Sequence, residues 1–405
     1  MPSSFITAAV LASALSTTPW QTTWFAAPQP TWDSSFILPT NIPASLSGQT
    51  VREVVRTSVG GRHVRVQFSN RYGATPLSIG AASIAVAGEG NAIVPGSSHP
   101  LTFHGHASVV VPPGAPVVSD PVAFPVGPLT RLAVSTYFPA TTPLTTFHWG
   151  DQQTASIGTG DVMQLTDIHD ATAMRGRAFL TGVLVDAQPN ARTVIAFGDS
   201  ITDGNGSTRD ANRRWPDALA QRVAGSGVAV INAGISGARL LQDKMGVNAL
   251  ARFEQDVLSQ PGAKTVIVML GINDIGWPGS PFAPHDPAVT PGQVIAGYQQ
   301  LIALARLHQV RIVGATLPPF EGALDGTPFA GHFSAAKDAV RHAVNHWIRT
   351  AGAFDAVIDA DTILRDPQRP ARLLPGFDSG DHLHPGDAGY QALADAIARD
   401  QLFPR

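Results

Sequence analysis

The N-terminal half of the chain alternates between apolar and polar positions as β-strands do. Residues 62–68 are the clearest case, with Val64, Val66 and Phe68 on one face of an extended chain and polar side chains between them. Clusters of glycine and proline separate such runs between about residues 50 and 186, and no amphipathic helix longer than two turns is indicated there. We therefore expect residues 20–189 to form an all-β domain, a sandwich or a jelly roll.

The pattern changes close to residue 190. Helical stretches now alternate with short apolar runs, and the clearest helix has a single apolar stripe at positions 340, 343, 344, 347, 348 and 351. Five apolar runs fit strands: residues 193–197, 228–232, 265–270, 310–316 and 354–360. Such alternation is typical of a parallel sheet with helices on both faces. We expect residues 190–405 to form an α/β domain with a five-stranded parallel sheet.

Composition narrows the range of functions. A chain of 405 residues, 44% hydrophobic and 14% charged, is too long for one ordinary core and suits two well-buried domains. The net charge is −3 and no long basic run exists, which argues against a nucleic acid as partner. The chain has no cysteine, which excludes disulfides, zinc–thiolate sites and cysteine nucleophiles.

The first residues resemble a targeting segment. Residues 5–15 form a short apolar run that contains Ala-Ser-Ala, although no lysine or arginine precedes it. The run is too short to span a membrane. We expect residues 1–19 to be a secretory signal and the protein to be secreted or periplasmic; the alternative is an ordered segment of a cytoplasmic protein, packed on the first domain.

Four polar, glycine-rich segments follow strands of the predicted parallel sheet. They are residues 197–204 after the first strand, 232–237 after the second, 270–274 after the third, and 378–385 beyond the fifth. Ligands of open parallel sheets bind outside the carboxyl ends of the strands. We therefore expect these segments to meet at one edge of the sheet and to form a site there.

The segments contain the groups that acyl transfer needs. Ser200 is a potential nucleophile, and His384 can act as the base that takes its proton. Asp381, three residues before His384, can fix the imidazole tautomer; Asp378 is a rival for this role. The backbone N–H groups of Ser200 and Gly237 and the side-chain amide of Asn273 can stabilise an oxyanion.

At this point the sequence resembles a known family. The segments contain Gly198-Asp199-Ser200, Gly237 within Asn-Ala-Gly-Ile-Ser-Gly, Asn273 within Gly-Ile-Asn-Asp, and Asp381-His382-Leu383-His384-Pro385. These are similar to the four blocks of the SGNH (GDSL) hydrolases, in the family's order, over residues 192–400. The first block reads Gly-Asp-Ser-Ile where the family pattern has Gly-Asp-Ser-Leu, a conservative departure.

The resemblance implies a fold and a set of roles. The fold is the flavodoxin-like, three-layer sandwich of the SGNH hydrolases. The roles are nucleophile for Ser200, the other triad members for Asp381 and His384, and oxyanion donors for Gly237 and Asn273. The β domain ahead of the hydrolase also makes the chain similar to two-domain bacterial members grouped with xylanase-cluster acylesterases. That second likeness rests on features such as Val-Arg-Val-Gln-Phe-Ser-Asn at 64–70.

Other polar residues have simpler explanations. Asp199, Asp203 and Asp274 are expected to bind backbone N–H groups in tight turns. His342 and His346 have the spacing of a zinc site, but Ala343 stands where a zinc protease has glutamate. The Gly-x-Ser-x-Gly elbow of the larger α/β-hydrolases is missing around Ser200. We expect no metal, and no cofactor is implied because proton transfer and oxyanion stabilisation suffice.

Three functions remain open at this stage. The first is a serine esterase acting on short-chain esters, acetyl groups on carbohydrate among them. The second is a lipase, thioesterase or arylesterase with the same triad and a longer pocket. The third is a non-catalytic carbohydrate-binding protein, against which the intact Ser200, Asp381 and His384 count. The loops beyond the third and fourth strands offer few large apolar side chains: Trp277, Phe282, Phe320 and Phe329. This favours a short pocket for a small-molecule or carbohydrate ester, with Trp277 and Phe320 as the expected pocket residues. The oligomeric state is left open.

Overall fold

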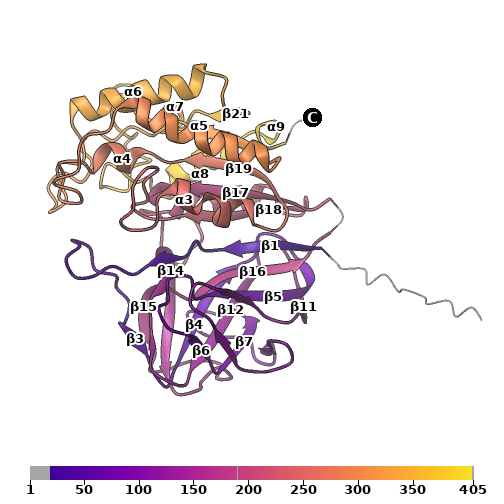
Figure 1. The fold of residues 1–405 in the computed structure, drawn as a ribbon. Coiled ribbons are helices and arrows are strands. Elements are labelled where there is room, and N and C mark those ends of the chain that lie inside the picture. Colours follow the sequence, from indigo (N-terminus) through magenta and orange to yellow (C-terminus); the bar gives the residue numbers. More distant parts are fainter. Residues whose placement is uncertain (1–18, 189, 404–405) are drawn as a thin grey trace, which may run out of the picture.

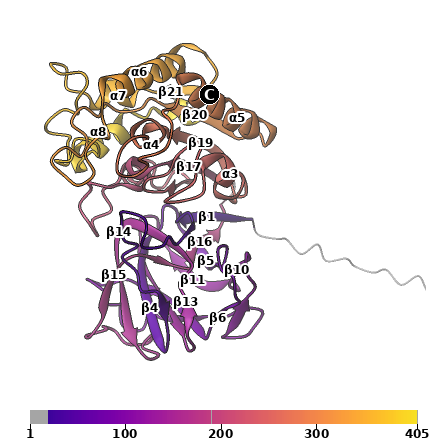
Figure 2. The ribbon, with the colours of Figure 1, turned by 60° about the vertical axis from the view of Figure 1, so that its left-hand side comes forward.

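The computed structural model describes residues 19–188 and 190–403, so the signal-like run at 5–15 lies outside the described residues. The chain forms a β-rich half and an α/β half, one above the other in Figures 1 and 2, with strand β1 (Trp20–Phe25) lying between them.

The N-terminal half is a sandwich of two antiparallel sheets. Its buried core lies between the sheets and includes Val64, Val66 and Phe68, which confirms the face predicted from the alternation. The first sheet has the order β1, β16 (Leu180–Asp186), β5 (Gly61–Ser69) and β10 (Pro116–Val118), and β11 (Val122–Val126) also pairs with β5.

The second sheet is the larger of the two. Its order is β15 (Thr172–Ala178), β14 (Thr146–Thr159), β4 (Gln49–Arg56), β12 (Arg131–Phe138), β7 (Ala81–Val86) and β8 (His99–Leu101), with β2 (Gln29–Pro30) on β14. Two short ribbons complete this half, β3 (Ser45–Leu46) with β13 (Thr142–Pro143) and β6 (Leu77–Ile79) with β9 (Val109–Val111). The expectation of an all-β N-terminal half is confirmed.

The C-terminal half contains the predicted five-stranded parallel sheet, within residues 190–403. Its order is β18 (Val228–Gly234), β17 (Arg192–Gly198), β19 (Ala263–Met269), β20 (Arg311–Ala315) and β21 (Ala356–Ile358). Helices cover both faces of the sheet, so side chains on both sides of each strand are buried. This explains why the strand sequences are near-continuous apolar runs. The α/β class is therefore confirmed.

Local sequence explains where the main helices begin. Helix α5 (Pro291–Leu307) starts with a capping box between Thr290 and Gln293 and has proline at its first position. Helix α6 (Ala335–Thr350) is capped by Ser334, and it buries Val344 and Ile348 of the predicted apolar stripe, whereas Ala343 is exposed. The others are α1 (Ser200–Asp203), α2 (Trp215–Arg222), α3 (Ala249–Phe253) running into a π-turn (Glu254–Leu258), α4 (Ile272–Gly276), α7 (Ala360–Leu364), α8 (Asp387–Ala396) and α9 (Arg399–Leu402). Among the described residues, none of the helices has the length and apolar character needed to cross a membrane.

The two halves share a buried junction. Strand β1 lies beside β18, an edge strand of the parallel sheet (Figure 1), and Ser58 of the β half accepts a hydrogen bond from the Val230 N–H at 2.7 Å. An apolar cluster also crosses the junction. Its members from the β half are Trp32, Phe36, Leu38 and Trp149, and its members from the α/β half are Met245, Trp277, Phe282 and Ala283. The β half thus covers a strand edge that would otherwise be open to solvent.

Candidate active site

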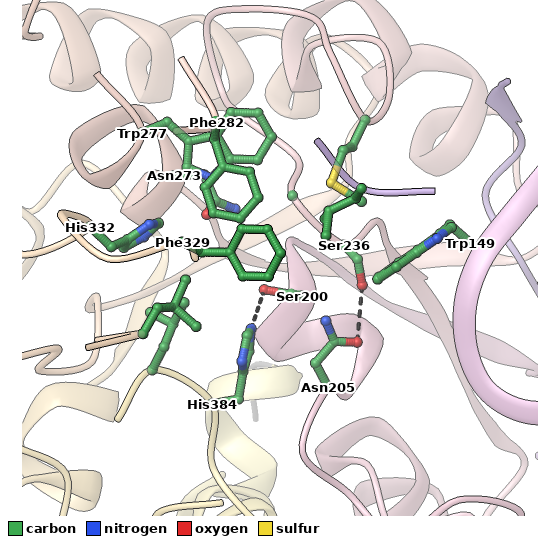
Figure 3. Close-up of a pocket in the computed structure, with 15 residues that line it drawn as sticks. Trp149, Ser200, Asn205, Ser236, Asn273, Trp277, Phe282, Phe329, His332 and His384 are labelled. Atoms are coloured by element: carbon green, nitrogen blue, oxygen red, sulfur yellow. Dashed lines mark hydrogen bonds between the residues drawn. The ribbon is translucent and has the colours of Figure 1, made fainter. Parts of the chain in front are cut away.

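The carboxyl edge of the parallel sheet brings the four predicted segments together. Ser200 follows β17, Gly237 follows β18 and Asn273 follows β19, while Asp381 and His384 lie in the loop before α8. Figure 3 shows Ser200 between His384 and the residues of the other two segments. The juxtaposition expected from strand order is therefore present.

Ser200 is the first residue of α1 and is separated from β17 by Asp199. The turn is held by Asp199, which caps the helix by accepting a hydrogen bond from the Ile201 N–H at 3.0 Å. Burial raises the pKa of Asp199 to about 7. The side chain of Ser200 is itself buried, so its hydroxyl meets the solvent only through the site.

His384 connects the serine to a carboxylate. Its Nε2 lies 2.8 Å from Ser200 Oγ, and its Nδ1 lies 2.6 Å from Asp381 Oδ2. The other carboxylate oxygen of Asp381 accepts hydrogen bonds from the backbone N–H groups of Leu383 and His384, at 3.0 and 2.8 Å. Burial acts to raise the pKa of Asp381, but the neighbouring His384 and these hydrogen bonds hold it well below its usual range. The carboxylate is therefore ionised at neutral pH.

The rival carboxylate belongs to a different pair. Asp378 binds the ring of His382, whose side chain is 44% exposed, and it also accepts from the His382 N–H at 3.1 Å. Asp378 thus pairs with His382 and does not orient His384. Asp381 is therefore the carboxylate that contacts the ring of His384.

The groups expected to bind an oxyanion line the same cavity as Ser200. Asn273 lies in the first turn of α4, and its Nδ2 donates to the Ala238 carbonyl at 3.0 Å, which fixes the amide plane. Gly237 has φ of +73°, and a Cβ at this position would lie 2.4 Å from Met245 Sδ. The conformation and the packing against Met245 therefore require glycine, whereas the sequence had suggested close approach of the substrate as the reason.

A cavity of about 170 Å³ opens beside Ser200. Its walls are mainly apolar, and Trp277, Phe282 and Phe329 form a stack with ring centroids 5.0 and 5.2 Å apart (Figure 3). The lining residues are Leu38, Trp149, Ser200, Asn205, Ser236, Gly237, Met245, Asn273, Trp277, Phe282, Leu324, Phe329, His332, Leu383 and His384.

Of the two residues predicted to line the pocket, one does so and the other does not. Trp277 lines the cavity, as expected. Phe320 does not: its side chain is fully buried in the core of the α/β half, edge-on to Phe333, so its expected place in the pocket is corrected. A loop phenylalanine can point to either side of its loop, and sequence gives no sign of which.

Several lining residues carried no signal in the sequence, among them Leu38, Trp149 and His332. Leu38 and Trp149 come from the β half, which therefore walls one side of the cavity. His332 comes from the loop before α6; burial, with a contribution from Lys337, lowers the pKa of its imidazole to about 3, so the ring is neutral. All three reach the site through long-range packing and belong to none of the four segments.

One of the three acidic turn residues binds within its own turn as predicted, and the other two do not. Asp199 caps α1, whereas Asp274 accepts from the N–H groups of Leu240 and Leu241, in the loop after β18, at 2.7 and 3.0 Å. Asp203 instead reaches across the junction, where its Oδ1 lies 3.1 Å from Nε2 of His148. Its role is therefore long-range and not that of a local turn.

The described residues contain one set of side chains close enough to bind a metal, namely His148, Asp151 and Asp203. Asp151, however, already binds Arg214 through Oδ1 at 2.7 Å and Arg177 through Oδ2. Both oxygens of this carboxylate therefore already bind guanidinium groups, which disfavours coordination of a metal ion by Asp151. The set is an ion-pair network. His342, on the exposed side of α6, pairs with Asp338 at 3.3 Å, as expected of a solvated face.

Several solved structures are similar to about half of this chain. No curated protein matches the chain. Among solved structures, an aryl esterase from M. smegmatis is 19% identical, with a TM-score of 0.41 over 51% of this chain and 96% of its own. A carbohydrate acetylesterase from Sinorhizobium meliloti is 20% identical, with a TM-score of 0.40 over 51% and 96%. A putative lipolytic G-D-S-L protein from Desulfitobacterium hafniense is 20% identical, with a TM-score of 0.37 over 50% and 96%.

The family comparison covers the region that contains the site. Residues 196–392 match the model of the GDSL-like lipase/acylhydrolase family, a span that begins just before Ser200 and ends in α8 beyond His384. Residues 196–392 thus form a carboxylic ester hydrolase domain of the GDSL-like lipase/acylhydrolase family.

Proposed function

We propose that this protein is a serine esterase that cleaves short-chain carboxylic esters through an acyl-enzyme on Ser200. The observation that carries the proposal is a continuous series of hydrogen bonds. Ser200 Oγ lies 2.8 Å from His384 Nε2, and His384 Nδ1 lies 2.6 Å from Asp381 Oδ2. A nucleophile, a base and a group that orients the base are thereby within hydrogen-bonding distance of one another.

The first half of the reaction forms the acyl-enzyme. Ser200 Oγ attacks the ester carbonyl carbon while its proton passes to Nε2 of His384, and the carbonyl oxygen becomes an oxyanion. The N–H groups of Ser200 and Gly237 and the amide of Asn273 would donate to this oxyanion. Collapse of the intermediate breaks the bond to the alcohol oxygen, which takes the proton from His384.

The second half consumes water. Water gives a proton to His384 and attacks the acyl carbon, and the new tetrahedral intermediate expels Ser200 Oγ, which regains its proton. Asp381 stabilises the imidazolium in both halves because its carboxylate is ionised and fixed by two backbone N–H groups. Every step uses groups of this chain and water.

The size of the cavity supports a short acyl group or a single ring. Its volume of about 170 Å³ is close to that of an engineered apolar cavity of about 150 Å³ that holds benzene. A long fatty chain needs an extended apolar channel. The stack of Trp277, Phe282 and Phe329 also favours aryl esters as a second substrate class, since flat rings pack well against aromatic faces. Acetylated carbohydrates belong to the short-acyl class.

A series of p-nitrophenyl esters from C2 to C16 tests the acyl preference. We expect kcat/KM to be highest for C2 to C4 and to fall by about tenfold or more by C12, because the longer chains leave the cavity. The same series with the inactive Ser200→Ala variant gives the background rate. Faster hydrolysis of C12 or C16 than of C2 to C4 would contradict the short-acyl proposal and support a lipase.

Activity is expected to fall on acidification. The base must be neutral to take the serine proton, so a protonated His384 cannot act. Asp381 does not cause the loss, because its pKa lies well below the usual carboxyl range and it stays ionised in this window. The measurement is kcat/KM between pH 5 and 9, with a stability check at each pH. A kcat/KM that keeps rising from pH 7 down to pH 5 would eliminate His384 as the base.

A further inference from the structure

A bulge in the β half lies against the site. Strand β14 loses its register with β15 between Trp149 and Thr154. Three successive residues in this bulge have positive φ: Gly150 at +91°, Asp151 at +38° and Gln152 at +49°. Side chains rarely adopt this conformation, so the contacts of the bulge must maintain it. Bulges of this kind are frequent next to active sites, where they redirect a side chain.

His148, just before the bulge, is buried, and both of its ring nitrogens have a hydrogen-bond partner. Its Nδ1 lies 2.8 Å from the Ala27 carbonyl, and its Nε2 lies 3.1 Å from Asp203 Oδ1. A carbonyl and a carboxylate both accept hydrogen bonds, so this arrangement favours the imidazolium, in which both ring nitrogens donate. Although burial lowers the pKa of His148, the Asp203 carboxylate raises it above its ordinary value.

Asp203 extends this series of hydrogen bonds toward the cavity. Its second oxygen, Oδ2, accepts from the Ser236 hydroxyl at 2.5 Å and from the Ser236 N–H at 3.2 Å. Asp203 is the last residue of α1, the helix that begins at Ser200, and Ser236 immediately precedes Gly237. One carboxylate therefore joins the helix of the serine to the loop after β18.

We propose that His148 is a positioning residue of the α/β half's site: it fixes the Asp203 carboxylate, which holds Ser236 and so aims the Gly237 N–H at the oxyanion. The inference rests on the proposed function, because it assigns Gly237 its role as an oxyanion donor. Without the imidazolium, the carboxylate can rotate away from Ser236, and the loop after β18 gains freedom. A displaced donor weakens the transition state more than the bound substrate.

The test compares His148→Ala with His148→Gln. We expect His148→Ala to lower kcat for a C2 ester by about 10- to 100-fold, since misplacement of catalytic groups by about 1 Å costs on that scale, while KM changes by less than about twofold. Affinity for a boronic acid, which forms a tetrahedral adduct on serine, should fall with kcat/KM. Gln keeps one N–H donor for Asp203 and should restore part of the loss.

Ser58→Ala is the matched control. It also removes a buried hydrogen bond of the junction, the one to the Val230 N–H, but it does not touch Asp203 or Ser236. Thermal unfolding measures what each variant costs in stability. We expect Ser58→Ala to leave kcat unchanged even where it lowers the melting temperature. Equal kcat losses in Ser58→Ala and His148→Ala would overturn the proposal, because a looser junction would then explain both.

Two further readouts keep the result decisive. If His148→Ala fails to fold, Ser236→Ala removes the hydroxyl that donates to Asp203 and that also lies 3.1 Å from Asn205 Oδ1, while it keeps His148 in place. This variant should still lower kcat and boronic acid affinity together; an unchanged kcat would overturn the proposal. Activity and boronic acid binding of the wild type distinguish a failure of the proposed function from a failure of the positioning role. A wild type that neither hydrolyses the ester nor binds the boronic acid contradicts the proposed function itself, whereas an active wild type with an equally active His148→Ala contradicts only the positioning role.

Discussion

Replacing Ser200 with alanine is expected to lower kcat by about 10⁴- to 10⁶-fold, as removal of one member of a catalytic unit does. The change deletes one oxygen at a buried position, so the fold should persist. The residual rate would come from the oxyanion donors and from binding alone. Steady-state kinetics on a C2 or C4 p-nitrophenyl ester measure the loss, and circular dichroism confirms that the variant is folded.

His384→Ala should have an effect of similar size, and the chain offers a matched control for it. His382 also binds an aspartate, Asp378, but its ring does not reach Ser200. His382→Ala should therefore retain activity within about threefold, because only a peripheral pair is lost. Covalent labelling by an organophosphate should modify the wild type at Ser200 and leave Ser200→Ala unmodified. Activity of Ser200→Ala within tenfold of the wild type would contradict the assignment.

The parts of the site that local chemistry determines could be predicted from the sequence. Ser200, Gly237 and Asn273 each follow an apolar run that becomes a parallel strand, and parallel strands bring their carboxyl ends to one edge. Asp381 reaches His384 because a turn of three residues lets its carboxylate bind both the ring and the backbone. Such relations depend on short spacings, which a sequence displays directly.

The contribution of the β half could not be predicted, because it depends on how two distant segments dock. Trp149 lies more than fifty residues before Ser200 and reaches the cavity through a bulge that no composition pattern marks. The role of Asp203 could not be predicted for the same reason. A turn role is the natural expectation for its position, but its partner His148 belongs to the other half of the chain.

Removing the β half is expected to destroy both stability and activity of the remainder. We propose that residues 20–189 and 190–405 are two domains that function as one body. A chain of residues 190–405 would expose the edge strand β18, now covered by β1, and the apolar surface of Met245, Trp277 and Phe282. Open edges and apolar patches promote aggregation.

Removal of the β half would also affect the residues that support the active site. Asp203 would lose His148, and Arg214 would lose the Asp151 carboxylate that it binds at 2.7 Å. The cavity would lose the wall formed by Leu38 and Trp149. Exposure of this junction should lower the unfolding free energy by several kcal/mol, out of a total that is usually about 5–15 kcal/mol. For a domain of this size, that corresponds to a melting temperature lower by about 10 °C or more.

The experiment compares three proteins: the full chain, residues 190–405 alone, and a full chain with a protease site introduced between Asp186 and Arg192. Soluble yield, melting temperature and kcat/KM on a C2 ester are the measurements. We expect the truncated chain to be poorly soluble and to have less than about 1% of the full activity, since both the cavity wall and the support of the oxyanion loop are gone. The cleaved full chain should stay associated and active, because buried contacts, and not the peptide link, hold the halves together. A truncated chain as soluble, stable and active as the full protein would show that the β half is dispensable for catalysis.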